Sequence, residues 1–228
     1  MKLSIITLFP EIFEPILSHS ILKRAAQKDL VEFNLVNHRD FGIGAHKVVD
    51  DKLYGGGQGM VLRVDVLSDA IEKTKTGQKG EKVILLDPQG LVYTQKIAEQ
   101  FSELSHIILV CGHYEGVDER VRDLVDYEIS IGDFVLTGGE IPAMALVDSI
   151  TRLIPGVLKE EMATKQESHS LVDGKRILEG PQYTRPEDFK GQKVPSVFLS
   201  GDPLKIHEYK SNAAVEKTAK RRPDLLDE

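Results

Sequence analysis

Three glycine-bearing turns hold the residues of this sequence that are best suited to bind a ligand. They lie at 87–90, 112–116 and 132–139, and each follows or ends an apolar run. In open parallel sheets, ligands bind beyond the carboxyl ends of the strands, and glycine lets backbone N–H and C=O groups approach them closely. The turns therefore predict one shared pocket; the alternative is that these glycines only shape the turns.

Known motifs restrict what such a pocket binds. The sequence contains neither G-x-G-x-x-G nor G-x-x-x-x-G-K-[ST], so dinucleotide and P-loop triphosphate sites lose their main support. No H-E-x-x-H and no histidine spacing joined to cysteine predicts a zinc site, and the lack of G-x-S-x-G weakens acyl transfer. Cys111 ends an apolar run, which favours a small buried hydrophobic residue over a nucleophile.

The stretch 49–60 is a second candidate for ligand binding. It has four glycines within 55–59, and it adds Asp50, Asp51 and Tyr54. Ordering so many glycines costs backbone entropy, which favours a long loop that closes over a ligand. A flexible linker is the alternative, although linkers seldom mix tyrosine and methionine with glycine.

The turns must be positioned by regular elements. Helical spacing of apolar residues occurs over 12–22, 94–104 and 117–125. Alternation of helices with apolar runs is typical of an α/β protein with a largely parallel sheet. Over 140–154 the apolar residues lie nearly all round the helix, which predicts deep burial and a contact between subunits. The predicted strands are 3–9, 33–36, 83–86, 107–111 and 127–131.

The pattern is lost after residue 155, and a polar stretch follows. We therefore predict a first domain over 1–158, a linker over 159–175 and a second domain over 176–228. In the second domain, Pro203 opens a helical region that ends near Arg222.

Charge limits the partners. The chain has 29 Lys plus Arg against 36 Asp plus Glu, a net charge of −7, which argues against a protein that coats nucleic acid non-specifically. Between Lys205 and Arg222, however, basic residues outnumber acidic ones, which indicates either a nucleic-acid contact or a solvated helix face. With one cysteine, no signal-peptide pattern and no apolar run of about 18 residues, we expect a cytoplasmic protein that has no membrane partner.

Read in order, these blocks closely resemble the bacterial tRNA (guanine-37-N1)-methyltransferase family, TrmD, over nearly the whole chain. The sequence departs from the family pattern at Leu53, where proline is usual, at 200–203, and in its early end after 221–226. The last two bear on the strength of tRNA binding. The blocks that carry the resemblance are 49–60, 88–90, 111–120, 130–140, 152–157 and 181–186.

The resemblance implies a SPOUT-type parallel sheet with a C-terminal trefoil knot, followed by a small, mostly helical C-terminal domain that binds tRNA with G at position 37. It also implies a homodimer with active sites at its interface, and no DNA partner. S-adenosyl-L-methionine is the implied cofactor, Mg²⁺ during catalysis is left open, and no metal ligand is assigned. By family position, the cofactor-binding residues are Leu85, Leu86, Pro88, Gly90, Gly112, Tyr114, Glu115, Ile131, Gly132, Asp133, Phe134, Val135, Leu136, Gly138, Gly139 and Pro142.

Methylation at N1 of guanine defines two catalytic roles. N1 carries a proton, so a base must remove it, and a donor must hold the negative charge that grows on O6. In the family an Arg after the long helix is the donor, which matches Arg152, and an Asp in the linker is the base. Glu167 is our assignment for the base, and Asp173 is the alternative because the linker is longer than usual.

Two rival functions remain at this point. A SPOUT RNA ribose 2′-O-methyltransferase needs an activated hydroxyl, and the blocks 54–57 and 182–186 count against it. A non-catalytic RNA-binding module would be favoured if the arginine and the linker acid were missing, but Arg152 and Glu167 are candidates for both roles.

Overall fold

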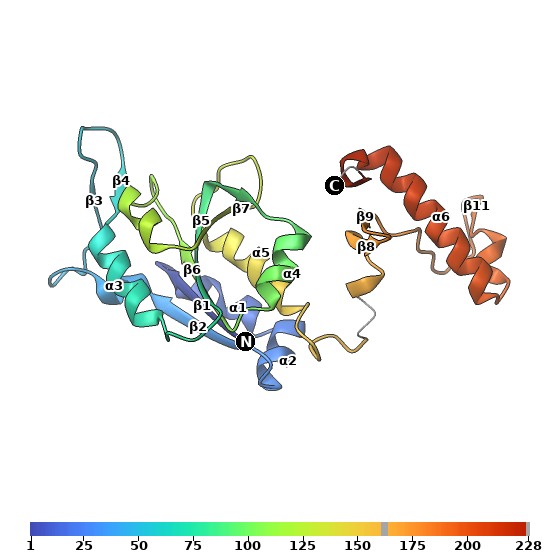
Figure 1. Ribbon diagram of the computed structural model, residues 1–228, viewed down its shortest axis with the longest axis horizontal. Coiled ribbons are helices and arrows are strands. Elements are labelled where there is room, and N and C mark those ends of the chain that lie inside the picture. The colour runs from blue at the N-terminus through green and yellow to red at the C-terminus, as the bar shows by residue number, and fades with distance from the viewer. Residues whose placement is uncertain (161–163, 227–228) are drawn as a thin grey trace. The chain divides into compact units, whose positions relative to one another are not determined.

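The chain folds into two compact units, Met1–Lys159 and Glu160–Glu228. The structure is a computed structural model that describes residues 1–160 and 164–226 (Figure 1). The division falls one residue after the end predicted for the first domain.

The first unit is built on a five-stranded sheet in which all strand pairs are parallel. The strand order is β2-β1-β6-β5-β7, so β6 and β5 are interior strands. The predicted α/β class and parallel sheet are therefore confirmed. β5 is longer than predicted because it resumes pairing with β7 after a register shift between Leu86 and Leu91. The strands are β1 (Lys2–Thr7), β2 (Glu32–Asn37), β5 (Glu81–Val92), β6 (His106–Cys111) and β7 (Tyr127–Ser130).

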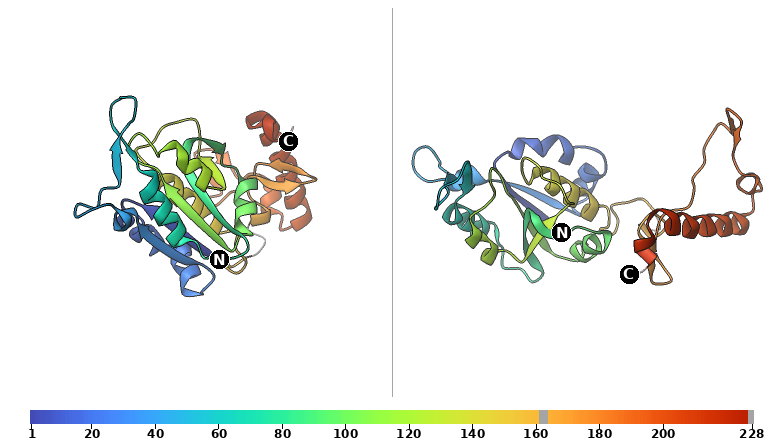
Figure 2. Two further views of the ribbon diagram at one scale, coloured as in Figure 1. Left: turned by 60° about the vertical axis from the view of Figure 1, so that its left-hand side comes forward. Right: turned by 90° about the horizontal axis from the view of Figure 1, so that it is seen from above.

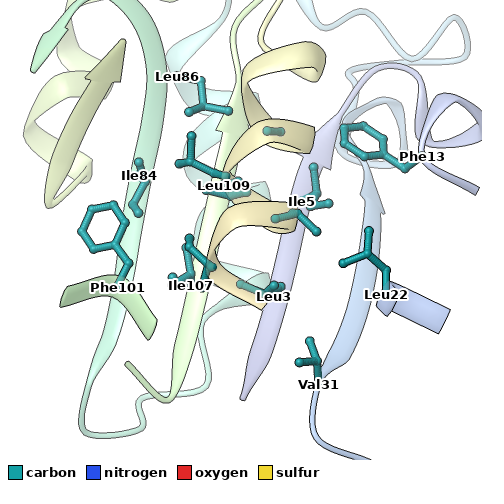
Figure 3. Packing of buried hydrophobic residues seen from close by; sticks show 14 of the residues in the cluster. Leu3, Ile5, Phe13, Leu22, Val31, Ile84, Leu86, Phe101, Ile107 and Leu109 are labelled. Carbon is teal, nitrogen blue, oxygen red and sulfur yellow. The ribbon is translucent and has the colours of Figure 1, made fainter. Parts of the chain in front are cut away.

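Both faces of this sheet are buried, which explains its continuous apolar runs. Successive side chains of a strand point to opposite faces. In β1, Leu3 and Ile5 join one core cluster, whereas Ile6 and the following Leu8 join the other. Figure 3 shows the first cluster, in which Phe13 packs with these strand residues.

Helices cover the two faces (Figure 2). The second face is covered by α3 and by the 3₁₀ segment Glu119–Leu124, where the sequence predicted a regular helix over 117–125. Residue Thr94 caps α4, and its Oγ1 accepts a hydrogen bond from the Ile97 N–H at 3.4 Å. The first face carries α1 (Glu14–Leu17), α2 (Ser20–Gln27), α4 (Gln95–Ser102) and α5 (Glu140–Thr151), and the second α3 (Val64–Thr74).

A hairpin occupies the region expected to be one long loop. β3 (Asp50–Lys52) pairs antiparallel with β4 (Met60–Leu62). The expectation of one long loop over 49–60 was therefore wrong in part. The glycines form only the connection between the two strands.

The second unit contains one long helix and short hairpins. The side chain of Asp202 caps α6 by accepting hydrogen bonds from the Leu204 and Lys205 N–H groups. The predicted linker 159–175 is corrected, because its end forms β8 and the start of β9, although 161–163 lie outside the described residues. The elements are β8 (Ser170–Val172), β9 (Lys175–Ile177), β10 (Asp188–Phe189), β11 (Gln192–Lys193) and α6 (Pro203–Arg221).

Further 3₁₀ segments are Pro10–Ile12, His38–Phe41, Ser196–Leu199 and Pro223–Leu226. Within the described ranges, no helix combines the length and the apolar character that a membrane span requires.

Candidate functional site

The segment 87–90 inside β5 and the turns after β6 and β7 surround one pocket of about 230 Å³. The predicted convergence of the three glycine turns is therefore what the fold produces, since the carboxyl ends of parallel strands meet at one edge of the sheet. The predicted cofactor residues that line this pocket are Leu86, Pro88, Gly112, Tyr114, Glu115, Ile131, Phe134, Val135, Leu136, Gly138, Gly139 and Pro142.

Four predicted cofactor residues do not line the pocket: Leu85, Gly90, Gly132 and Asp133. Leu85 is fully buried in the second core cluster. Gly90 lacks a side chain for a packing reason, because a Cβ there would collide with the backbone of Glu128. Gly90 was predicted to bind the cofactor, but the pairing of β5 with β7 is by itself enough to require glycine at this position.

Backbone contacts hold the second and third turns together. The Gly139 N–H donates a 2.8 Å hydrogen bond to the Gly112 carbonyl, and His113 forms a bridge with Gly138. A Cβ on Gly139 would stand only 2.7 Å from the Cys111 Cα. Gly139 is therefore required by the close packing of two chain segments, and this need arises before any ligand binds.

A buried carboxylate lies beside this contact. Glu140, the first residue of α5, is 6% exposed and accepts a 2.8 Å hydrogen bond from the Thr7 hydroxyl. Burial, together with the nearby charge of Glu140, raises the pKa of the Cys111 thiol well above its usual value. Cys111 is thus a buried neutral thiol. This agrees with the small buried residue that the sequence favoured over a nucleophile, because only the thiolate is strongly nucleophilic.

His113 contributes an unsatisfied polar atom to the pocket wall. Among the described residues, its buried Nδ1 has no hydrogen-bond partner. Its ring packs edge-on against Phe9 and Tyr114, with centroids 5.1 and 4.7 Å away. His113 therefore lines the pocket with a polar atom that the described protein groups leave unsatisfied.

A wider cavity of about 1160 Å³ adjoins the pocket. The two share Asp87, Gln89, Glu115 and Gly116 in their linings. The β3–β4 hairpin forms the other wall and brings Tyr54 into the lining. The arrangement can hold a small ligand in the pocket and a larger molecule in the open cavity.

Ion pairs set the charges of this wider cavity. Arg63 pairs with Asp65 at 2.7 Å and with Asp51 at 3.2 Å. The hydrogen bond to Arg63 is the main reason why the pKa of Asp65 is lowered. Arg120 similarly pairs with Asp118 at 2.8 Å, which lowers the pKa of that carboxyl. The wall of the wider cavity therefore carries guanidinium groups that are paired with carboxylates, and acidic side chains outnumber basic ones in its lining.

Arg152, the predicted O6 donor, lies apart from the pocket in its own chain. Arg152 follows the last residue of α5, whereas Gly139 and Pro142, at the other end, line the pocket. Over 12 residues at about 1.5 Å each, this helix separates them by roughly 18 Å. Glu167 and Asp173 belong to the second unit, and Asp173 lies in the β8–β9 turn with a φ of 51°.

Sequence reasoning overlooked several lining residues. Asp87, Gln89 and Thr137 line the pocket, and all three lie within the turns that the sequence singled out. Thr7 had no local signal, because its partner Glu140 is 133 residues away. Another hollow, of about 920 Å³, surrounds Met1 and Lys2 among other residues and contains none of the predicted motifs. Within the part of the chain that the structure describes, no group of three metal-ligating side chains occurs.

The parallel sheet and the pocket at its carboxyl edge define an α/β protein with a candidate ligand site. The family model described as tRNA (Guanine-1)-methyltransferase TrmD matches residues 1–228, and the chain belongs to that family. It is 50% identical to a tRNA (guanine-N(1)-)-methyltransferase of Geobacillus kaustophilus (strain HTA426), covering 100% of this chain and 92% of the relative. Relatives of the same name from Bacillus pumilus (strain SAFR-032) and Bacillus subtilis (strain 168) are 51% and 50% identical, covering 100% and 99% of this chain and 92% of each relative.

Proposed function

We propose that this chain is a tRNA (guanine-N1)-methyltransferase that transfers a methyl group from S-adenosyl-L-methionine to N1 of guanosine 37, next to the anticodon. The observation that carries the proposal is the pocket formed by three glycine turns, in a chain that belongs to the TrmD family over its whole length. The names of the relatives support tRNA as the substrate and guanine N1 as the methylated atom.

The donor set of the pocket fits S-adenosylmethionine. Apolar side chains such as Leu86, Ile131 and Leu136 suit an adenine ring, and the glycine backbones leave polar groups for its edges. His113 Nδ1 adds a buried polar atom that has no partner among the described residues. When bound, the cofactor supplies an electrophilic methyl group on a sulfonium.

The chain's own residues then have two tasks. Glu167 accepts the N1 proton, which turns a poor nucleophile into a good one. Arg152 donates hydrogen bonds to O6 and holds the charge that grows there as the proton leaves. Asp173 remains the alternative base, since it lies in the same unit as Glu167.

The position of Arg152 supports a homodimer with shared sites. Its separation of roughly 18 Å from the pocket end of α5 exceeds the reach of an arginine side chain. The Arg152 of a second copy would have to complete the site. Apolar side chains exposed near the pocket support the same contact: Phe134 is 53% exposed, Val135 83% and Ile141 55%.

We also propose a trefoil knot in the sheet of the first unit and an RNA-binding role for the second unit. The segment 87–90 lies between two pairings of β5 with β7. The turn 132–139 returns to the end of β6, where Gly138 forms a bridge with His113. Such returns of the chain are what a knotted segment requires. In the second unit, α6 bears the exposed basic residues Lys205, Lys220 and Arg221, which suit the phosphates of an anticodon stem-loop. Because its proposed substrate is tRNA, we expect the enzyme to act in the cytoplasm.

One assay separates this proposal from its rivals. An unmodified tRNA transcript with guanosine after the anticodon is incubated with the protein and the methyl donor, and its nucleosides are analysed. We expect 1-methylguanosine, and none when that guanosine is replaced by adenosine. A ribose-methylated nucleoside would favour a 2′-O-methyltransferase, and tRNA binding with no methylation would favour a non-catalytic module.

A further inference from the structure

Tyr54 is a large aromatic residue that the fold leaves in water. Its side chain is 99% exposed, and it lies near the tip of the β3–β4 hairpin, which projects from the body of the first unit (Figure 1). It lines the wide cavity but not the cofactor pocket. Burial of such a ring would contribute to stability, so its exposure beside a cavity suggests a role in recognition.

The three glycines that follow Tyr54 form the tip of the hairpin, and the space around them is open. Gly55, Gly56 and Gly57 have φ values of 82°, 84° and 133°, and no atom lies within 4 Å of where a Cβ would stand on any of them. These conformations are readily available only to glycine. The tip is therefore shaped by its own backbone, and it leaves room for a flat ligand and its backbone beside Tyr54.

Hydrogen bonds fix this hairpin to the wall of the cofactor pocket. The Glu115 N–H donates to the Met60 carbonyl at 3.0 Å, and the Leu62 N–H donates to the Gly116 carbonyl at 3.0 Å. Gly59 lies so close to Glu115 that a Cβ there would collide with its carboxylate. A ligand bound on the hairpin is therefore held at a fixed position relative to the cofactor pocket.

The exposed ring of Tyr54 matches one class of ligand. Arg63 and Arg120 line the same cavity, and both guanidinium groups are partly or largely exposed. Exposed aromatic rings bind single-stranded nucleic acid by stacking on its bases. Arg63 and Arg120 are already paired with Asp51, Asp65 and Asp118, so the ring, and not the charge of the cavity, favours RNA.

We propose that Tyr54 stacks on the unpaired nucleobase that flanks the methylated guanine in the RNA. The target base must reach the cofactor pocket, which Tyr54 does not line, so the ring is left for a neighbour of that base. This inference rests on the proposed tRNA substrate. It makes Tyr54 a residue for RNA recognition, with no part in cofactor binding.

Kinetics with the unmodified tRNA transcript test this role. Tyr54→Leu removes the ring, and we expect kcat/KM for the transcript to fall by about 5- to 150-fold, the range for loss of one base–aromatic stack. Tyr54→Phe is the matched comparison, because it keeps the ring, and we expect it to lose much less kcat/KM than Tyr54→Leu. The affinity for S-adenosylmethionine should be unchanged in both variants. Equal kcat/KM for wild type and Tyr54→Leu would overturn the proposal, as would a loss of cofactor affinity.

Fluorescence gives a second readout that does not depend on methylation. The chain has no tryptophan, so Tyr54→Trp has the only indole in the protein. We expect the transcript to quench its emission by stacking. Tyr127→Trp, at the start of β7, is the control that should not respond. Absence of quenching when the transcript is shown to be bound would overturn the inference.

The proposed methylation and the stacking of Tyr54 can be tested separately. If wild-type protein leaves the transcript unmethylated while the Tyr54→Trp emission is quenched, the proposed function fails and the stacking stands. If methylation occurs and the tryptophan is silent, only the stacking fails. A Tyr54→Leu variant that sediments as a smaller species than wild type would assign the ring to a contact between copies, and would also overturn the proposal.

Discussion

Thr7 and Glu140, which lie 133 residues apart, are joined by a 2.8 Å hydrogen bond from the threonine hydroxyl to a buried carboxylate. The bond ties the end of β1 to the first residue of α5. A carboxylate at the start of a helix is also stabilised by the helix dipole. The same helix end carries Gly139 and Pro142 into the cofactor pocket, so this bond supports the pocket from behind.

Removing this hydroxyl should destabilise the fold. We expect Thr7→Val to lower the free energy of unfolding by about 1.5–3 kcal/mol, since it removes a hydrogen bond to a charged buried group. Thr7→Ser keeps the hydroxyl and should lose much less. Urea denaturation of the three proteins measures the difference. A valine variant as stable as wild type would mean that Glu140 gains little from this contact.

The buried His38 should make stability depend on pH. It is 1% exposed, and burial, with a smaller effect of the Arg39 charge, lowers the pKa of its imidazole from 6.5 to about 4. The unfolded chain therefore binds a proton that the folded chain excludes. This cost is absent above pH 6.5 and grows as the pH falls toward 4, by up to about 1.4 kcal/mol per pH unit.

We expect His38→Gln to lose this dependence. Urea midpoints measured at intervals between pH 7 and 4 should fall more steeply for wild type than for the variant. His38→Gln is less stable at neutral pH if it fits the site poorly, but the slope, not the absolute value, is the readout. Parallel curves for the two proteins would show that His38 does not titrate in this window.

The sequence predicted the strands of the sheet because parallel strands buried on both faces are continuous apolar runs. The pocket followed from glycine turns that come directly after those runs. α3 was overlooked, although Val66, Leu67, Ala70 and Ile71 have helical spacing. The spacing of these four residues is enough to predict the helix.

Other features had no local signal. β3 consists of Asp50, Asp51 and Lys52, whose polar side chains show no alternation, and its pairing with β4 depends on backbone hydrogen bonds. Contacts such as Thr7–Glu140 join distant segments, so only the fold reveals them. Gly90 and Gly139 were assigned to the ligand, whereas the structure shows that the backbones of Glu128 and Cys111 leave no room for a side chain.

The glycines of the pocket therefore predict two different defects. A Cβ on Gly112 would stand 3.4 Å from the Leu86 carbonyl oxygen, an ordinary contact at the pocket wall. We expect Gly112→Ala to keep the fold and to weaken S-adenosylmethionine binding at least about tenfold, as measured by calorimetry. Gly139→Ala should instead lower the free energy of unfolding by about 1–3 kcal/mol, because it overpacks against Cys111. If Gly139→Ala instead weakened cofactor binding and Gly112→Ala lowered the stability, Gly139 would be the glycine whose backbone meets the ligand.

The identity of the base can be decided by conservative substitutions. Glu167→Gln keeps the size of the side chain but cannot accept the proton, so the single-turnover rate should fall by about 10²–10⁴-fold. Glu167→Asp should retain part of the activity. Asp173→Asn should be nearly silent, and S-adenosylmethionine binding should be unchanged in all three. An inactive Asp173→Asn beside a normal Glu167→Gln would transfer the role to Asp173.

The shared site predicts that two inactive variants restore each other. Gly112→Val fills the pocket, and Arg152→Ala removes the O6 donor, so each homodimer should be inactive. In a mixed dimer, the pocket of the Arg152→Ala chain meets the intact Arg152 of the other chain. Equal mixing after denaturation and refolding together should then recover about a quarter of the wild-type sites.

Light scattering of each variant should report about twice the chain mass of 25.4 kDa, so that exchange occurs between dimers. The control is to mix the folded proteins without denaturation, which should recover less activity if the dimer exchanges slowly. Mixed dimers that form but stay inactive would show that each chain uses its own Arg152. The chain would then have to bring the end of α5 and its own pocket together, against the roughly 18 Å that the helix places between them.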